Sequence, residues 1–432
     1  MVSVSTGLIS GLDTAGLIDS LIAVESNPQT LLKNKLADAK ADAGAYRNVN
    51  TKFDALRTAA EALGKAATWG AAKATSSSSA VAVTAGSTAT PGSTSFTVDS
   101  LAARHTVVGT AAYDSTAGLS LSVADRDGDT AATPVSIPAG TSLADAVKLI
   151  NDAKAGVTAS IVGGNRLQLA ATNPGLDGAF DVTGGSFGTV QEGSDAKVTV
   201  KGTGTYSFSA TSTSNTFTDL LPGVTLTVGA VTTDPVTVDV TSDPDAVASA
   251  VQSLVDAANS VLTAISGYTD SKSTVAVLKG DSTMRGLAGK VLDAVATAIG
   301  GTASASQAGI QLTRYGTVSF DKSTFTKALA ADPALTQSLV DGSTGTPAVP
   351  GVAQRILDVV KEASDSVTGS LVVRAKTEDD ESSDLQTQID DWDRRLALRR
   401  TTLQNQFTAM ETALGSLQNQ SSWLSSQLSK LA

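Results

Sequence analysis

Residues 384–431 read DLQTQIDDWDRRLALRRTTLQNQFTAMETALGSLQNQSSWLSSQLSKL, a stretch without proline. Apolar residues recur in it at spacings of three and four, which is typical of a coiled-coil seam. As one helix the stretch would be about 70 Å long, more than a small domain can enclose. The sequence therefore predicts a long helix whose seam needs a partner helix. The seam comprises Leu385, Ile389, Trp392, Leu396, Leu403, Phe407, Met410, Leu414, Leu417, Leu424, Leu428 and Leu431, with a gap at Ser421.

The intramolecular partner of this seam is expected at the other end of the chain. Asp13 or Thr14 can cap a short helix. Asn27 is the expected cap of a second helix, with Pro28 in its first turn and Leu63 near its end. Both helices carry one apolar stripe, so the two chain ends should lie together. The stripes comprise Leu17, Ile18, Leu21 and Ile22 in the first helix, and Leu32, Leu36, Ala39, Ala43, Tyr46, Val49, Phe53, Leu56, Ala60 and Leu63 in the second.

The middle of the chain changes to alternating Thr, Val and Ser, which indicates strands. A hairpin turn is expected at Gly163-Gly164-Asn165, and one helix, 142–153, opens with a capping-box-like Ser142 and Asp145. The expected strands are 81–84, 95–98, 119–123, 157–162, 167–170, 197–200, 224–228 and 236–240. Helices are expected after Pro244, over 282–299 and over 351–364, with a hairpin over 312–320 that turns at Tyr315-Gly316.

These patterns predict a multidomain α+β chain, in which N- and C-terminal helices pair as a coiled coil and β-rich domains are inserted into a mixed helical and hairpin domain. We expect four parts. They are a terminal coiled-coil leg, 1–45 with 384–432; a mixed helical domain, 46–75 with 241–383; a β-rich domain, 76–107 with 190–240; and an outer β-rich domain with one helix, 108–189.

Composition argues against several classes of function. The formal charge of −11 disfavours nucleic acid binding, which needs clustered Lys and Arg. The chain has no cysteine, so disulfides and thiolate metal sites are excluded. No apolar run reaches the ~18 residues of a membrane span. The N-terminus lacks the basic and apolar regions of a secretory signal, so any export is expected to use a route without a cleaved peptide.

The search for catalytic, metal and cofactor sites gives only weak candidates. His105 is the one histidine and is interpreted as a structural residue. Residues 125–129, DRDGD, resemble the start of a calcium loop, but its glycine is misplaced, and Ser136 stands where the bidentate Glu should be. Residues 202–204, GTG, lack the third glycine of a dinucleotide loop, so a strand bend is expected. The sequence therefore predicts no enzyme, no cofactor and no metal.

Four arginines, Arg394, Arg395, Arg399 and Arg400, form the densest basic cluster. An anionic ligand is one interpretation. The favoured one is a set of helical ion pairs, because Asp390 and Asp391 stand four residues before the first two arginines. The acidic run 378–381 is expected at a helix N-terminus, which favours negative charge.

Both ends of the chain resemble the flagellar filament cap protein family, also called flagellar hook-associated protein 2. The N-terminal resemblance rests on Ser10-Gly11-Leu12-Asp13-Thr14, Ile18, Leu21, Glu25 and Pro28. The C-terminal one rests on Gln406-Phe407, Ala409-Met410-Glu411, Leu414, Leu417, Gln420-Ser421-Ser422-Trp423-Leu424 and Gln427-Leu428. Residues 221–226, 280–283 and 332–333 also fit the family. Tyr315 stands where the family more often has an acidic residue. Residues 75–195 resemble the family only in their strand-like pattern.

The resemblance implies a secreted protein that forms a homo-oligomeric ring at the tip of the flagellum and promotes folding and insertion of exported flagellin. It implies further partners in the hook–filament junction proteins and in a cytoplasmic export chaperone at the C-terminal helix. The assembly seam would comprise Leu12, Leu17, Ile18, Leu21, Leu32, Leu36, Leu403, Phe407, Met410, Leu414, Leu417, Trp423, Leu424 and Leu428. The alternative hypothesis is a surface adhesin whose β-rich inserts bind glycans or host surfaces, with host glycans as the partner. A secreted hydrolase would need a catalytic set that the sequence does not reveal.

Overall fold

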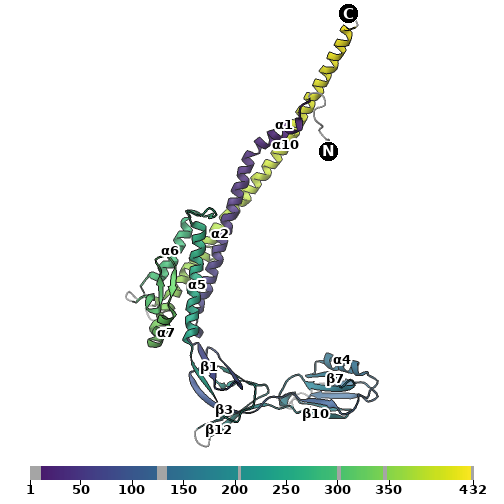
Figure 1. Ribbon diagram of the computed structural model, residues 1–432, viewed down its shortest axis with the longest axis vertical. Helices are drawn as coiled ribbons and strands as arrows, with labels where there is room; N and C mark the ends of the chain where they lie inside the picture. The colour runs from purple at the N-terminus through teal and green to yellow at the C-terminus, as the bar shows by residue number, and fades with distance from the viewer. Residues whose placement is uncertain (1–10, 124–133, 203–205, 299–302, 344–347, 430–432) are drawn as a thin grey trace. The chain divides into compact units, whose positions relative to one another are not determined.

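The computed structural model describes residues 11–123, 134–202, 206–298, 303–343 and 348–429 (Figure 1). The chain forms two compact units. One joins both chain ends, Met1–Gly64 with Ala250–Ala432, and the other is Lys65–Ser249. The first is mainly helical and the second mainly β, as the sequence patterns predict.

The first unit is built around paired helices from the two chain ends. Helix α2 packs along α10 and against α9, and α1 packs on α10. The helices are α1 (Thr14–Glu25), α2 (Asn27–Leu63), α5 (Pro244–Thr269), α6 (Ser282–Ala296), α7 (Lys322–Ala331), α8 (Pro333–Val340), α9 (Val352–Ser364) and α10 (Ser370–Leu428), with a 3-10 turn η2 (Ala305–Ala308). Two hairpins complete the unit, β16 (Ile310–Leu312) with β17 (Val318–Phe320) and β18 (Gly342–Ser343) with β19 (Val349–Pro350).

The predicted apolar stripe of α2 is confirmed. Its members recur every three or four residues and therefore share one helix face. From Leu36 to Leu63 all nine of them are buried, and Phe53 and Leu56 have no exposed surface. Helix α2 contacts both α9 and α10, and its Phe53 is fully buried. It is therefore the central helix of this unit.

Two predicted helix starts are wrong. Ser26, not Asn27, precedes α2, and Asn27 is already its first helical residue. Helix α10 begins at Ser370, fourteen residues before Asp384. The first segment of α10 buries Leu371, but the charged residues over 376–384 interrupt the apolar pattern from which a helix is predicted. The acidic run 378–381 consequently lies inside α10 and not at its N-terminus.

Other predictions for this unit hold in their main features. Helix α9 matches the expected 351–364, and the expected hairpin turns where Gly316 adopts a φ of +73°. Helices α7 and α8 were not predicted. Each is short and capped by an aspartate, Asp321 or Asp332, whose side chain accepts backbone N–H groups in the first turn.

The second unit contains a β-sandwich of two antiparallel sheets. Their strand orders are β1-β15-β3-β11-β12 and β13-β14-β2. The elements are a short helix α3 (Ala66–Trp69) and strands β1 (Ala72–Ser76), β2 (Val81–Ala85), β3 (Gly92–Ser100), β11 (Ala196–Lys201), β12 (Ser207–Ser212), β13 (Thr216–Leu221), β14 (Val224–Val228) and β15 (Val236–Ser242). Phe96, Val198, Phe217 and Leu226 are central to its core.

A separate core lies in the outer part of this unit. Its sheets have the orders β10-β4-β8-β7 and β6-β5-β9, and α4 contacts β7. The elements are β4 (Thr106–Gly109), β5 (Leu119–Val123), β6 (Val135–Ile137), α4 (Leu143–Ala153), β7 (Val157–Val162), β8 (Arg166–Ala171), a 3-10 turn η1 (Leu176–Gly178), β9 (Phe180–Thr183) and β10 (Phe187–Gln191). Ser142 caps α4 and Gly163 and Gly164 turn the β7–β8 hairpin with positive φ, as predicted.

Candidate assembly surface on the terminal helices

The first part of α2 and the first half of α10 share a small apolar core. Leu36 and Ala39 of α2 are buried against Leu385 and Ile389 of α10, with Leu32 partly buried beside them. These contacts confirm that the two chain ends pair. The two helices run antiparallel, and each stabilises the other along the seam, because an isolated helix is only marginally stable in water.

A buried glutamine sits at the end of this core. Gln29 is 5% exposed, and its Nε2 donates to Asp393 Oδ1 at 2.6 Å. The same nitrogen lies 3.4 Å from the carbonyl oxygen of Ile389, and Gln29 Oε1 accepts from Lys33. A satisfied polar group inside an apolar seam fixes the register of two helices, because slippage would leave it unpaired. Apolar periodicity could not reveal this residue.

Helix α1 is held on α10 by one apolar anchor and two ion pairs. Asp13 caps α1 by accepting from the backbone of Gly16, and Ile18 is buried. Arg399 Nε donates to Glu25 Oε1 at 3.0 Å. Arg400 donates to Asp19 Oδ1 through its terminal nitrogen Nη2. Both pairs are exposed, so each contributes about 0.2–1 kcal/mol.

The basic cluster on α10 therefore makes contacts both within α10 and with α1. The predicted set of ion pairs within the helix was only partly correct. Arg394 pairs within α10, but with Asp391 three residues before it and not with Asp390. Arg395 stacks its guanidinium 4.5 Å from the centre of the Trp392 ring. Arg399 and Arg400 reach across to α1 instead. The cluster fastens helices together within one chain, which favours neither a free anion site nor a purely solvated flank.

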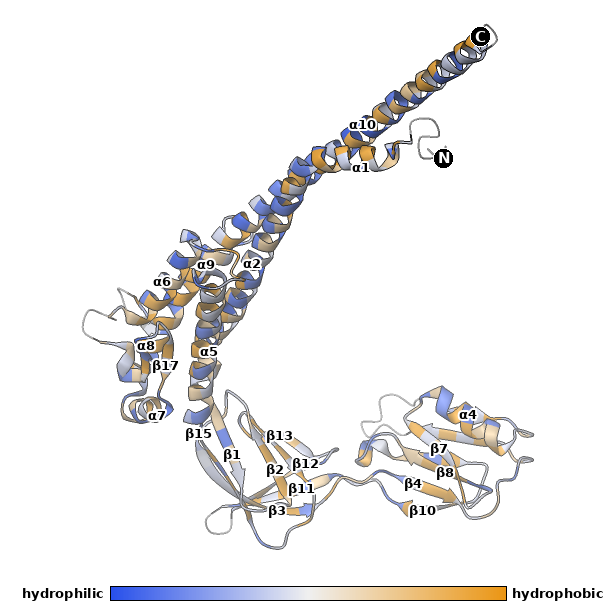
Figure 2. Cartoon of the chain, turned by 45° about the horizontal axis from the view of Figure 1, so that its top comes forward, coloured by the Kyte–Doolittle hydropathy of each residue, from blue (hydrophilic) through white to orange (hydrophobic). Residues whose placement is uncertain are grey.

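Beyond α1, the apolar face of α10 continues without a covering helix in the described chain (Figure 2). Leu417 is 59% exposed and Leu424 is 54% exposed. Of the fourteen proposed seam residues, Ile18, Leu36 and Leu403 are buried and Leu32 and Phe407 are partly buried. The exposed ones are Leu12, Leu17, Leu21, Met410, Leu414, Leu417, Trp423, Leu424 and Leu428.

The two halves of α10 differ sharply in charge. From Ser370 to Arg400 the sequence carries fourteen charged residues, whereas from Leu403 to Leu428 it carries only Glu411. The first half is fastened by ion pairs and by Gln29, and the second presents leucines among Gln, Asn, Ser and Thr. We call residues 403–428 the distal seam. Contacts made there depend on apolar burial, so they should respond little to salt.

A cluster of acidic groups lies where α2 passes α10 and the start of α6. The Tyr46 hydroxyl donates to Asp281 Oδ2 at 2.8 Å, and Asp281 Oδ1 caps α6 at the backbone of Met284. Burial, followed by the negative charge of Glu378, raises the pKa of Asp42 to about 6. Burial and Glu381 likewise raise the pKa of Glu378, although Arg374 opposes the shift. The charged form of Asp42 is therefore disfavoured in the folded chain.

Asp42→Asn is expected to raise the free energy of unfolding by about 1 kcal/mol at pH 7.5, after allowing for solvent screening. Because the folded pKa is about 6 and the ordinary value is 3.8, protonated Asp42 stabilises the fold below about pH 4, and this contribution is lost as the pH rises through 6. The gain from the substitution should thus vanish at pH 4. Thermal melts at both pH values measure it, with Asp358→Asn, an exposed residue of α9, as the control.

The weak candidates for catalytic, metal and cofactor sites do not form such a site among the described residues. His105 packs its ring edge-on against Phe180 at 4.8 Å, which agrees with a structural role. Residues 125–129 and 203–204 lie outside the described part of the chain. Among described residues, no three His, Cys, Asp or Glu side chains are grouped to hold a metal ion. None of the described helices is long and apolar enough to cross a membrane.

Paired terminal helices that leave a long apolar seam open, together with inserted β domains, define a structural assembly protein. Sequence comparison then specifies the family. The profile "Flagellar hook-associated protein 2 C-terminus" matches residues 193–419, more than half of the chain. The N-terminal profile of the same family matches 10–105, and the "Flagellin hook IN motif" matches 110–173. The chain belongs to the flagellar hook-associated protein 2 family and is a flagellar filament cap protein.

Individual relatives agree over nearly the whole length. The chain is 26% identical over 471 aligned residues to flagellar hook-associated protein 2 of Escherichia coli strain K12, covering 99% of this chain and 98% of that protein. The A-type flagellar hook-associated protein 2 of Pseudomonas aeruginosa is also 26% identical, with coverages of 98% and 97%. The crystal structure of the flagellar cap protein FliD D1-D2-D3 domains from Escherichia coli shares the fold, with a TM-score of 0.59 at 24% identity, covering 78% of this chain and 99% of that one.

Proposed function

We propose that the distal seam is the surface through which this cap protein assembles, and that it takes up helices of flagellin and of further copies of the chain. The observation that carries the proposal is the row of exposed leucines and Trp423 on a helix whose other half is already partnered. Water-exposed apolar rows of this extent mark interaction surfaces. An open helical seam is covered by another helix that presents apolar residues at matching spacing.

In this scheme the protein is exported through the flagellar type III apparatus and forms a homo-oligomeric ring at the filament tip. Flagellin emerging beneath the ring folds and inserts as the seams bind and release it. Hook–filament junction proteins are the partners before the filament grows. A cytoplasmic export chaperone covers the distal seam before export, since an exposed apolar helix face would otherwise promote aggregation.

The four-part division stays part of this proposal. The leg, 1–45 with 384–432, carries the assembly seam, and the mixed helical domain, 46–75 with 241–383, anchors it. The β-rich domain, 76–107 with 190–240, and the outer domain, 108–189, hold copies together. The comparisons give no support to the adhesin hypothesis or to host glycans as partners, and these are not carried forward.

Site-specific photocrosslinking tests the proposed surface. The chain has no cysteine, so Ser421→Cys, at the gap in the seam, creates a unique thiol for a benzophenone maleimide. In intact filaments we expect adducts with flagellin or with a second copy of the chain. Ser422→Cys, on a face of the helix that carries neither the leucine row nor Trp423, is the matched control and should give at least about fivefold less. Equal yields from the two positions would refute a face-specific docking surface.

A further inference from the structure

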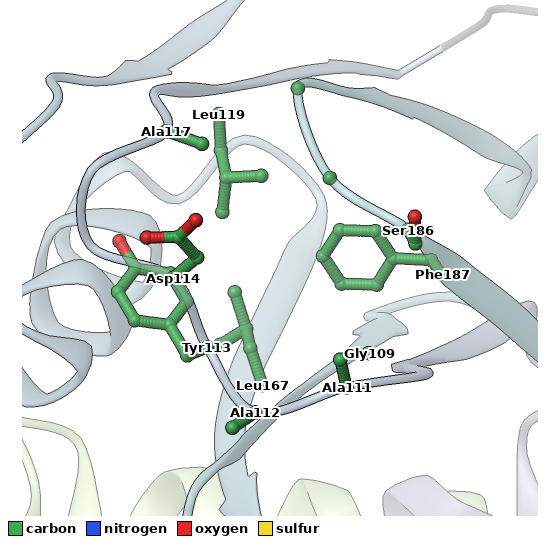
Figure 3. Close-up of a pocket in the computed structure, with 12 residues that line it drawn as sticks. Gly109, Ala111, Ala112, Tyr113, Asp114, Ala117, Leu119, Leu167, Ser186 and Phe187 are labelled. Atoms are coloured by element: carbon green, nitrogen blue, oxygen red, sulfur yellow. The ribbon is translucent and has the colours of Figure 1, made fainter.

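A chamber of about 470 Å³ opens in the outer β region, unconnected with the terminal helices. Its walls come from β4, β5, β8 and β10 and from the loops that join them. Figure 3 shows Leu119 and Leu167 entering the space from opposite sides, with the Phe187 ring facing Tyr113 across it. Its volume falls within the range of pockets that bind small molecules.

Glycines form part of its wall, where the chain turns tightly against neighbouring residues. Gly184 has a φ of +95°, and a Cβ there would lie 2.0 Å from the carbonyl oxygen of Gly118. A Cβ on Gly185 would lie 2.9 Å from the ring of Phe187 and 3.0 Å from Leu119. Side chains at these positions would force the turn away from the β5 and β10 residues that it touches. The turn thus seats backbone directly against the apolar wall.

The rim carries a single charged group. Asp114 Oδ1 accepts from the backbone N–H of Thr116 at 2.9 Å and from its hydroxyl at 2.7 Å. These bonds lower the pKa of Asp114, so the carboxylate stays ionised. Within the described chain no hydrogen bond reaches its other oxygen, Oδ2. The carboxylate is therefore both held in place and available.

The aromatic wall of the chamber has a polar atom without a partner. The Tyr113 hydroxyl is buried and has no hydrogen-bond partner among the described residues. Its backbone N–H donates to the carbonyl of Asn165, which holds the loop against the β7–β8 turn. A buried hydroxyl without a partner is costly, and a bound molecule or water can satisfy it.

We propose that this chamber binds a small organic amine with a flat apolar body, the body lying between Phe187 and Tyr113 and the ammonium group lying at Asp114. Apolar walls favour the body through burial of its surface. The Asp114 carboxylate favours a cation. An anionic ligand of the same shape would instead be repelled by Asp114, the only charged residue that lines the chamber among the described residues.

Two probes that share one apolar body but carry opposite charges test the proposal on the full chain. Binding of 1-naphthylmethylamine and of 1-naphthoic acid is followed by amide shifts in NMR spectra, with Gly109 and Gly185 as reporters in the chamber wall. The amine is expected to bind about tenfold more tightly, since attraction in one case and repulsion in the other each contribute a few-fold. Shifts should remain confined to the outer domain.

Two variants test which residues cause the preference for the amine and the binding itself. Asp114→Asn keeps the oxygen that Thr116 uses but removes the charge, so the preference for the amine should fall to about twofold. Phe187→Ala should weaken both probes several-fold while distant signals show that the domain remains folded. Asp181→Asn, an exposed site on β9, is the charge control. Equal binding of the two probes, shifts away from the chamber, or no shift with either probe up to its solubility limit would overturn the proposal.

Discussion

A strain whose cap protein carries Leu417→Asp and Leu424→Asp is expected to release flagellin into the medium and to grow short filaments or none. The two leucines are 59% and 54% exposed in the single chain, so the substitutions cost the isolated fold little. Once a partner helix covers the seam, each aspartate becomes a buried, unpaired charge that costs several kcal/mol. Docking should weaken by at least about a hundredfold, the equivalent of about 3 kcal/mol.

The matched control is Thr408→Asp with Ser422→Asp, which adds the same two charges to exposed positions of the same helix away from both the leucine row and Trp423. Filament length measured by electron microscopy and flagellin in the medium should be normal for this control. Circular dichroism and thermal melts of both purified proteins should match those of the unchanged chain. Normal filaments from the leucine variant would show that the distal seam has no part in assembly.

The largest expected effect on stability is that of Phe53→Ala in α2. Phe53 has no exposed surface and lies on the central helix of the first unit. Truncating a fully buried phenylalanine leaves a cavity and typically costs about 3–5 kcal/mol. Because the chain divides into two compact units, the loss should appear in the helical transition alone.

Calorimetry with a matched variant of the second unit checks this division. Phe208→Ala removes the same ring from β12, where it is 44% exposed, and should cost about 0.5 kcal/mol or less. Phe53→Ala should lower the melting temperature of the helical unit by several degrees and leave the β transition unchanged. A loss spread equally over both transitions would contradict the independence of the two units.

Much of the helical frame was predictable because its packing is periodic. The nine positions of α2 from Leu36 to Leu63 repeat at three and four residues, and each is buried. Pairing of α2 with α10 followed from the two stripes. The start of α10 was not predictable in this way, because the charged residues over 376–384 interrupt the apolar pattern while the helix continues through them.

The β strands were predictable where apolar and polar residues alternate, as in β14 and β15. Several strands escaped because their sequences are mainly Ser, Thr and Ala, such as β1 (AKATS) and β12 (SFSATS). Both are edge strands of the five-stranded sheet. An edge strand needs fewer apolar contacts than a central one, so its sequence carries a weaker signal.

The assembly surface was only half predictable. Apolar spacing located the seam, but it could not separate Leu385, which is buried within the chain, from Leu417, which is left open. That division depends on where α1 begins and on polar residues at the helix contacts, namely Gln29 and the pairs of Arg399 and Arg400. Such residues lie off the seam or break its apolar pattern, so periodicity does not reveal them.

The most direct test of the cap role is the amount of unpolymerised flagellin in the medium of a deletion strain, measured together with filament length. The account predicts short or absent filaments, flagellin accumulating in the medium, and restoration of both by the unchanged chain. Filaments of normal length with no released flagellin in the deletion strain would contradict it.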